Sequence, residues 1–312
     1  MQKLLFEQAE TLDEESSGGH GSNWEALVGD TEEFISTWLQ YAIENGKLLE
    51  DVSGEFEFNR QRLLKSGEVN IAAIAFSEPE GSQVKILPLI AINVEGDEND
   101  GQISNQFWST YPCFLDGMKF TATVQNISLY PNRVEAKLEL ASNMEDIFNL
   151  HVFDVMFWKN RFVYQQDRVY DFSVAALAYS LTPVDPDEEA VINRPELIAA
   201  LRNLQGSEAE DDFEPIHVSM AKMHAYLPKT EYQADMAEIR GEIVDFEPEY
   251  AEFLGNTISR IDVVIGESDE DVVLPIYYTH RSLMDGCKPA VGDFIQGVVW
   301  LQTFMVLENK SG

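Results

Sequence analysis

The 312-residue chain has few cysteines, few basic residues and no long apolar run. Its two cysteines, Cys113 and Cys287, are far apart and form no C-x-x-C pair, so we expect neither a disulfide framework nor a zinc ribbon. The longest apolar stretches, 69–76 and 86–94, are shorter than the ~18 residues of a membrane-spanning helix. The acidic first residues lack the apolar stretch of an export signal. These absences predict a soluble, cytoplasmic protein without membrane association.

The patterns of common catalytic sites are absent as well. The five histidines show no zinc-binding spacing, and neither a phosphate-binding glycine loop nor a G-x-S-x-G motif occurs. His280 and Cys287 flank a short connector that could bring a thiol near a base, but a surface histidine and a buried thiol explain them more simply. We therefore expect a protein without enzymatic activity, metal or cofactor.

Acidic residues are abundant and unevenly distributed. The chain has 55 Asp and Glu against 21 Lys and Arg, which gives a formal net charge of −34 and a pI near 4.3. Residues 1–119 contain 22 acids and 7 bases, 182–252 contain 18 and 5, and 120–181 contain only 7 and 5. Spread evenly over the surface, this charge has about a quarter of the density of duplex DNA. Imitation of nucleic acid would therefore require the acids to gather on one face.

One strand design recurs along the chain. The segment VGDFIQGVVWL at 291–301 alternates with period two after a tight turn and has Gly297 in mid-strand. The segment RVYDFSVAALAYSL at 168–181 aligns Asp171 with Asp293 and Ala175 with Gly297. A small residue also precedes an aromatic pair by 36, 36 and 37 residues (Ala72 to Trp108, Ala122 to Trp158, Gly241 to Tyr278). These regularities predict internal β repeats, most clearly at 120–181 and 237–306.

Each repeat reads as three strands, a connecting segment and a fourth strand. A small residue in mid-strand is typical of a bend or of two backbones in close approach, as in a small barrel. With GEIVDFE at 241–247, DVVLPIYY at 271–278 and VGDFIQGVVWL at 291–301, the unit resembles the OB-fold, a five-stranded Greek-key barrel. The resemblance implies binding of oligonucleotides, oligosaccharides or proteins. The missing fifth strand has to come from elsewhere, and 216–227 is a candidate.

The predicted fold is mainly β, α+β overall, with tandem OB-like small β-barrels, an N-terminal helical segment and an inserted helix. The predicted domains are a helical segment at 1–66, a partial β unit at 67–119, an OB-like barrel at 120–181, an acidic linker with a short helix at 182–215 and a second OB-like barrel at 216–312. Helices are expected near 3–14, from Asp30 or Thr31 to about Asn45, and in RPELIAALRNL at 194–204, with a flexible Gly/Ser link at 15–23. The alternative is a plain α+β protein whose half-buried strands look alike.

Two classes of function compete. In the first, a non-enzymatic acidic interaction protein binds a basic protein partner, and an inhibitor that imitates nucleic acid is one form of it. Acidic blocks are more often solvated linkers, so this interpretation needs a coherent surface. The acidic patches expected to bind the partner are Glu208, Glu210, Asp211, Asp212, Glu214, Asp245, Glu247, Glu249, Asp269, Glu270 and Asp271.

In the second class, the barrels bind an oligonucleotide or a glycan. Aromatic faces beside guanidinium groups suit stacked bases or sugars, although core rings and surface arginines are the simpler interpretation. Phosphate binding needs clustered Lys and Arg, and even 120–181 is net negative, so charge argues against nucleic acid but not against a neutral glycan. Acidity that only aids solubility is a third explanation. The ligand-binding residues of the second class are Trp158, Lys159, Arg161, Arg168, Tyr278 and Arg281.

Overall fold

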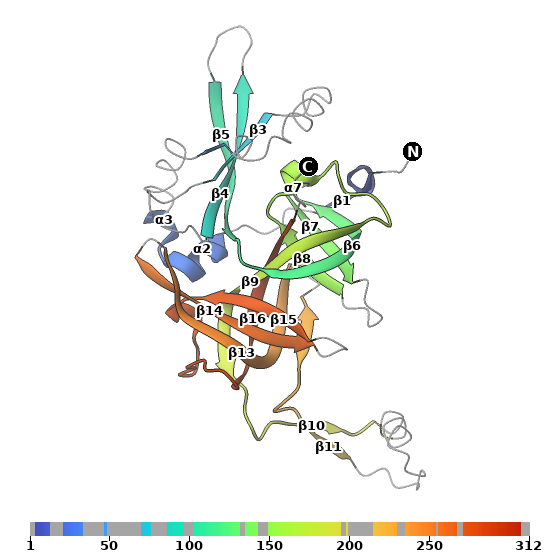
Figure 1. The fold of residues 1–312 in the computed structure, drawn as a ribbon, viewed down its shortest axis with the longest axis vertical. Helices are drawn as coiled ribbons and strands as arrows, with labels where there is room; N and C mark the ends of the chain where they lie inside the picture. The colour runs from blue at the N-terminus through green and yellow to red at the C-terminus, as the bar shows by residue number, and fades with distance from the viewer. Residues whose placement is uncertain are drawn as a thin grey trace, which may run out of the picture.

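The fold is mainly β, as predicted, and most of its strands belong to one large mixed sheet (Figure 1). The computed structural model describes residues 4–12, 21–33, 47–48, 70–75, 86–96, 103–131, 135–142, 149–194, 198, 215–229, 235–253, 255–266 and 271–306. The segments predicted as the four strands of each repeat are strands, with one exception. The segment LHVFDVMFW ends its strand at Asp154 and becomes helical at Phe157–Asn160 (α7).

Five strands pair in a closed ring that we call ring 1. In pairing order they are β6 (Met118–Leu129), β7 (Ala136–Ser142), β8 (Asn149–Asp154), β16 (Phe294–Met305) and β9 (Val169–Pro183). The contact between β8 and β16 is parallel, and the other contacts are antiparallel. The pairing of β9 with β6 closes the ring.

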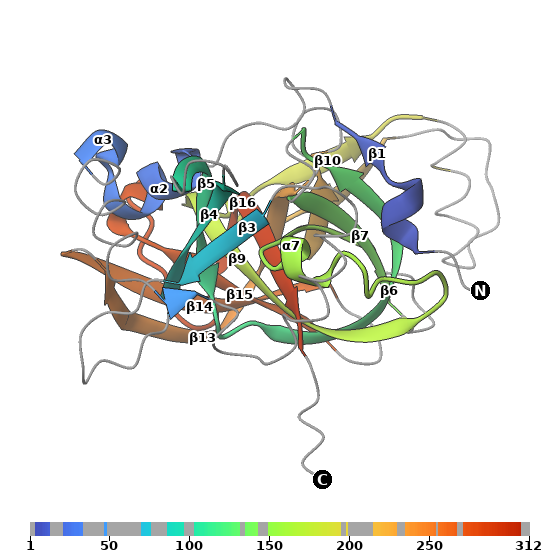
Figure 2. The same cartoon turned by 90° about the horizontal axis from the view of Figure 1, so that it is seen from above.

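A second ring, ring 2, repeats this order. Its strands are β13 (Met236–Phe253), β14 (Asn256–Gly266), β15 (Val272–Tyr278), β9 and β16. The contact between β15 and β9 is parallel, the other contacts are antiparallel, and the pairing of β16 with β13 closes the ring. Both rings contain the β9–β16 pair. Figure 2 shows β9 and β16 between β6–β7 on one side and β13–β14 on the other.

The two rings share β9 and β16, the last strands of the two repeats. β9 follows β8 in the chain and also pairs with β15 at Ala176 and Leu177, while β16 follows β15 and also pairs with β8 at Gln302 and Thr303. Each ring therefore contains the four strands of its own repeat and the last strand of the other repeat. The sequence-based candidate for the fifth strand, 216–227, was wrong: within it, β11 (Ile216–Ser219) pairs with β10 (Glu189–Ile192), and β12 (Ala225–Pro228) pairs with β13.

Mid-strand glycines lie where backbones approach closely. A Cβ placed on Gly241 would lie 1.8 Å from the carbonyl oxygen of Val264, and one on Gly297 would lie 2.0 Å from that of Ser180. Only glycine leaves room for these carbonyl groups. Two of the small residues that revealed the repeat, Gly241 and Gly297, are therefore required by strand packing inside the rings.

Two hydrophobic clusters stabilise the structure. The larger one fills both rings and includes Leu138 and Val152 of ring 1 and Ile261 and Leu274 of ring 2. The second lies outside the rings and combines Phe153 and Trp300 with Tyr111, Phe114 and Trp24 from earlier parts of the chain. Burial of so much apolar side-chain surface is the main force that holds the shared strands together.

Two smaller sheets lie at opposite ends of the long axis (Figure 1). Strands β2 (Lys47–Leu48), β3 (Asn70–Ala75), β4 (Ile86–Gly96) and β5 (Ile103–Phe114) form an antiparallel sheet at one end. The two-stranded ribbon of β10 and β11 extends from the other end. The end of β5 runs into the second hydrophobic cluster through Tyr111, Cys113 and Phe114.

The N-terminal helices differ from the prediction. In place of a helix near 3–14 there is a short 3-10 helix, η1 (Leu5–Gln8), followed by β1 (Glu10–Thr11), which pairs with β6. The end of the predicted Gly/Ser link begins α2 (Gly21–Val28), because buried Trp24 and Leu27 attach that helix to the second cluster. Of the helices predicted at 31–45 and 194–204, the described residues contain α3 (Thr31–Glu33) and Ile198, and the remainder lies outside them.

Candidate functional site

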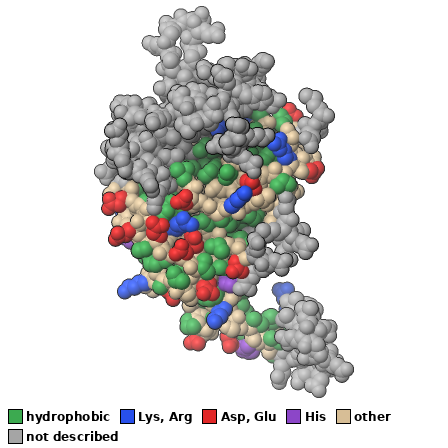
Figure 3. Space-filling model, viewed as in Figure 1, with side chains coloured by type: hydrophobic (Ala, Val, Ile, Leu, Met, Phe, Trp, Pro, Cys, Tyr) green, Lys and Arg blue, Asp and Glu red, His purple; other side chains and the backbone are tan. Residues whose placement is uncertain are grey.

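Exposed carboxylates gather on the distal half of β13. We call Asp245, Glu247, Glu249 and Glu252 the β13 acidic surface, and all four side chains are exposed. The one arginine of this strand, Arg240, is 5% exposed and lies in the proximal half. Figure 3 shows acidic side chains clustered where β13 and β14 lie, with few basic ones among them.

The one basic residue of the neighbouring strand β14, Arg260, is bound to an acid of its own strand. Asp245 lies opposite Asp262 of β14, and Glu247 lies opposite Arg260. Arg260 donates two hydrogen bonds to the carboxylate of Asp262, at 2.8 and 2.9 Å. This bidentate pair directs the charge of Arg260 mainly to Asp262 and less to the β13 acidic surface.

The other acidic residues predicted to bind a partner are mostly not described. Asp271 is exposed just before β15. The predicted acids Glu208, Glu210, Asp211, Asp212, Glu214, Asp269 and Glu270 lie outside the described residues. The structure thus brings Asp245, Glu247 and Glu249 together, and it adds Glu252, which the sequence analysis did not select.

The residues predicted to bind a base or sugar are distributed over core and surface. Arg161 is 1% exposed and lies over the rings of Phe6 and Phe162, and Tyr278 is 3% exposed in the large core. Arg168 is exposed and lies over Tyr170, Arg281 is exposed and donates to Asn256 (2.8 Å), and Lys159 is half-buried. The side chain of Trp158 lies outside the described residues.

The outer face of β14 and β15 in ring 2 is covered by the turn after β5. The ring of Tyr277 stacks on Phe114, with centroids 4.4 Å apart and planes at 5°, and its hydroxyl donates to the carbonyl of Asp116. Tyr250 donates a 2.7 Å hydrogen bond to Oδ2 of Asp116. Burial raises the pKa of Tyr277 to about 12. An aromatic ring that stacks on the chain in this way leaves no free face for a ligand.

The outer face of β7 and β8 in ring 1 is covered by residues near β12. Nζ of Lys137 lies 3.2 Å from Oδ1 of Asp235, and both side chains are buried. Trp300 donates a 2.8 Å hydrogen bond to the other oxygen of Asp235, and the His151 amide donates to the hydroxyl of Tyr226 (3.0 Å). In both rings, therefore, the outer face of the second and third strands is in contact with other segments of the same chain.

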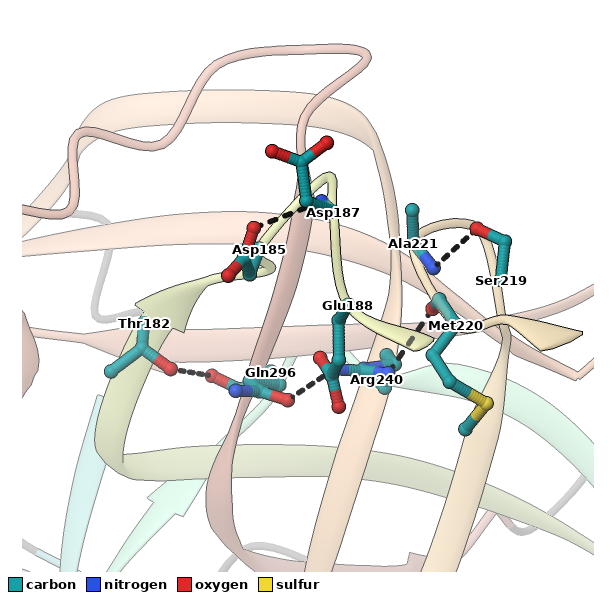
Figure 4. Close-up of polar contacts among 9 residues, drawn as sticks. All are labelled: Thr182, Asp185, Asp187, Glu188, Ser219, Met220, Ala221, Arg240 and Gln296. Carbon is teal, nitrogen blue, oxygen red and sulfur yellow. Dashed lines mark hydrogen bonds and ion pairs between the residues drawn. The ribbon is translucent and has the colours of Figure 1, made fainter. Parts of the chain in front are cut away.

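A buried arginine attaches the β10–β11 ribbon to ring 2 (Figure 4). Arg240 donates to the carbonyl of Met220 (3.1 Å), to the amide oxygen of Gln296 (2.7 Å) and to the carboxylate of Glu188. Glu188 precedes β10 and Met220 follows β11, so both lie at the same end of the ribbon, and Gln296 lies on β16. The network has a structural role, and sequence alone did not indicate it because each residue fits a solvated strand position.

The buried titratable groups among the described residues do not form a nucleophilic site. Burial raises the pKa of Cys113 to about 12 and also raises that of Cys287, which disfavours the reactive thiolate. His280 is exposed in η3 (His280–Ser282). Among the described residues, no three His, Cys, Asp and Glu side chains are placed to hold a metal ion.

Comparison with models of protein families, with curated proteins and with solved structures finds no match. Over the part of the chain that the structure describes, no helix has both the length and the apolar character needed to cross a membrane.

Proposed function

We propose that the protein is a non-enzymatic interaction protein whose β13 acidic surface binds a basic protein. The observation that carries the proposal is the row of exposed carboxylates at Asp245, Glu247, Glu249 and Glu252, next to an arginine already bound by Asp262. Such a surface would attract Lys- and Arg-rich partners over roughly a Debye length, ~8 Å at physiological salt.

We further propose that rings 1 and 2 are OB-like barrels joined by strand exchange. Their five-stranded rings with one parallel contact support this interpretation. Ligands of OB-folds bind across the second and third strands, and here those faces contact Asp116, Tyr250 and Tyr226. This coverage favours the acidic surface over the alternative, an oligonucleotide or glycan held by aromatic and arginine side chains of the barrels.

Edge protection is a competing explanation for the same carboxylates. Beyond Ile243, β13 has β14 as its one strand partner within the described residues, and the strand carries register shifts and Pro248 there. Charges, bulges and proline on an edge all prevent pairing with other chains. Lysine protects an edge as well as glutamate does, so the two explanations can be separated by reversing the charge.

The test is binding of a fluorescent decalysine peptide, measured by anisotropy at low and at physiological salt. We expect Asp245→Lys/Glu247→Lys/Glu249→Lys to weaken binding at least roughly tenfold and to leave the oligomeric state of the protein unchanged, because the edge remains charged. The neutral set Asp245→Asn/Glu247→Gln/Glu249→Gln should weaken binding less.

A matched control neutralises three exposed acids elsewhere, Glu7→Gln/Glu10→Gln/Asp187→Asn, and so has the same net charge as the neutral set. We expect this control to bind almost as well as the unaltered protein. Equal loss in both neutral sets, or no salt-dependent binding at all, would contradict a specific acidic site.

A further inference from the structure

A hollow of about 250 Å³ lies at one edge of β6. This edge pairs with β9 along Met118–Thr123 and with β1 along Ser128–Leu129. Between the two partners, residues 124–127 pair with no strand on this edge within the described part of the chain. The hollow occupies this interruption, and β6 contributes Val124, Gln125, Asn126 and Ile127 to its lining.

Two segments from distant parts of the chain form its walls. One wall is η1 with the residue after it, and the other is the turn that leads into β9. A β bridge between Leu4 and Gln165 and a 3.1 Å hydrogen bond from the Leu5 amide to the carbonyl of Tyr164 join the walls. The wall residues that line the hollow are Leu5, Gln8, Ala9, Gln166 and Asp167.

Amide groups dominate the polar part of the lining. Gln8 and Gln166 each offer an NH₂ donor and a carbonyl acceptor, and Asp167 adds a carboxylate. The amide of Gln125 already donates to the hydroxyl of Thr123 (2.7 Å), and Oδ1 of Asn126 already accepts from the amide of Ile127 (2.9 Å), so only part of each of these groups is left for a ligand. The side chains of Gln8, Gln166 and Asp167 make no hydrogen bond or ion pair with other described residues, so a ligand can use them. No basic residue lines the hollow, and the remaining lining is aliphatic.

We propose that this hollow binds one neutral sugar ring. Adjacent hydroxyl groups both donate and accept, which matches amides beside a carboxylate, and the C–H groups of a sugar pack on aliphatic side chains. An anionic ligand would be repelled by Asp167 without compensation from a base. The volume is below the ~300–1,000 Å³ of pockets for drug-sized molecules, which limits the occupant to a single ring. The site is separate from the β13 acidic surface.

The experiment is saturation-transfer NMR on the full chain with D-glucose, D-galactose and N-acetyl-D-glucosamine. The methyl glycoside of each sugar imitates the end of a glycan, whereas the unsubstituted sugar imitates a free monosaccharide. Inorganic phosphate, observed by phosphorus NMR, serves as the anionic probe. We expect saturation transfer from at least one sugar or glycoside and no binding of phosphate.

The variant Asp167→Gly removes the carboxylate at a residue with φ of 59°, a conformation that glycine adopts without strain. The control Asp285→Gly makes the same change at an exposed aspartate with φ of 52°. We expect Asp167→Gly to weaken sugar binding at least roughly tenfold and Asp285→Gly to leave it unchanged. No transfer from any probe, an equal effect of both variants, or binding of phosphate instead would overturn the proposal.

Discussion

The hydroxyl of Tyr164 donates a 2.6 Å hydrogen bond to Oδ2 of Asp154, and both side chains are fully buried at the end of ring 1. The amide of Met156 donates to the other carboxylate oxygen (2.9 Å). Burial nevertheless outweighs these two hydrogen bonds and raises the pKa of Asp154 to about 7.

This raised pKa makes stability depend on pH. The unfolded chain has a pKa near ~3.9 at this position, so the contribution of Asp154 to stability is present below about pH 4 and is lost as the pH rises through 7. Asp154→Asn does not titrate. We expect the free energy of unfolding of the variant, minus that of the unaltered protein, to increase between about pH 4 and pH 8 by on the order of 2–4 kcal/mol in urea titrations.

Asp171→Asn provides the control for this pH series. Hydrogen bonds from Thr121 and Lys119 lower the pKa of Asp171, so its contribution to stability is lost as the pH falls. Its variant should therefore differ from the unaltered protein in the opposite direction. If Asp154→Asn shows no change with pH, the buried carboxyl is not a titrating group.

Alanine at the mid-strand glycines should destabilise both rings. At Gly241 and Gly297 the new Cβ would meet backbone carbonyl oxygens at 1.8 and 2.0 Å, which forces strands apart. We expect each substitution to lower the free energy of unfolding by more than ~3 kcal/mol in urea titrations. Gly255→Asn is the control, since no atom lies within 4 Å of its Cβ position and asparagine tolerates the positive φ; a loss as large as that at Gly241 would contradict the steric explanation.

The buried ion pair of Lys137 and Asp235 predicts a double-mutant result. Lys137→Met leaves a buried carboxylate without its cation and should cost on the order of 3–5 kcal/mol. The double variant Lys137→Met/Asp235→Asn should recover most of this loss, because the introduced amide needs no counter-charge and its oxygen can still accept from Trp300. Stability is measured by chemical unfolding, and additive losses would show that the two groups do not interact.

Strand exchange predicts that the rings open together. Leu301 is buried on β16 within the core that fills both rings, and Leu301→Ala should cost ~2–5 kcal/mol. In native-state hydrogen exchange, we expect the amides of β7 and of β14 to lose protection by equal free energies. Loss confined to one of these strands would show that each ring is stable by itself.

Sequence patterns located the strands well because period-two alternation is a local property. The alternation in 291–301 and the small residues at 241 and 297 follow directly from burial on one side of a strand and from close backbones. Strand partners are not local. Each repeat has four strands in both the sequence and the structure, but nothing near β15 in the chain indicates that its parallel neighbour is β9.

The candidate site was predictable only where acidic residues lie on an exposed strand. The density of acids in 182–252 indicated Asp245, Glu247 and Glu249, which are exposed. The expectation that charged residues are exposed fails for Lys137, Asp154 and Arg240, which occupy polar positions of their strands but are covered by distant segments. The equivalence drawn between the aromatic pairs also did not hold throughout, since Phe157 lies in α7 whereas Tyr277 lies in β15.

Because both rings contain β9 and β16, ring 1 cannot complete its folding early in synthesis. During synthesis, β6, β7, β8 and β9 leave the ribosome long before β16 does, and ring 1 cannot close without β16. Four strands with an unsatisfied edge must therefore persist while the intervening chain emerges, a state prone to aggregation. The strongly negative charge of the chain would make such incompletely folded intermediates repel one another, which opposes aggregation.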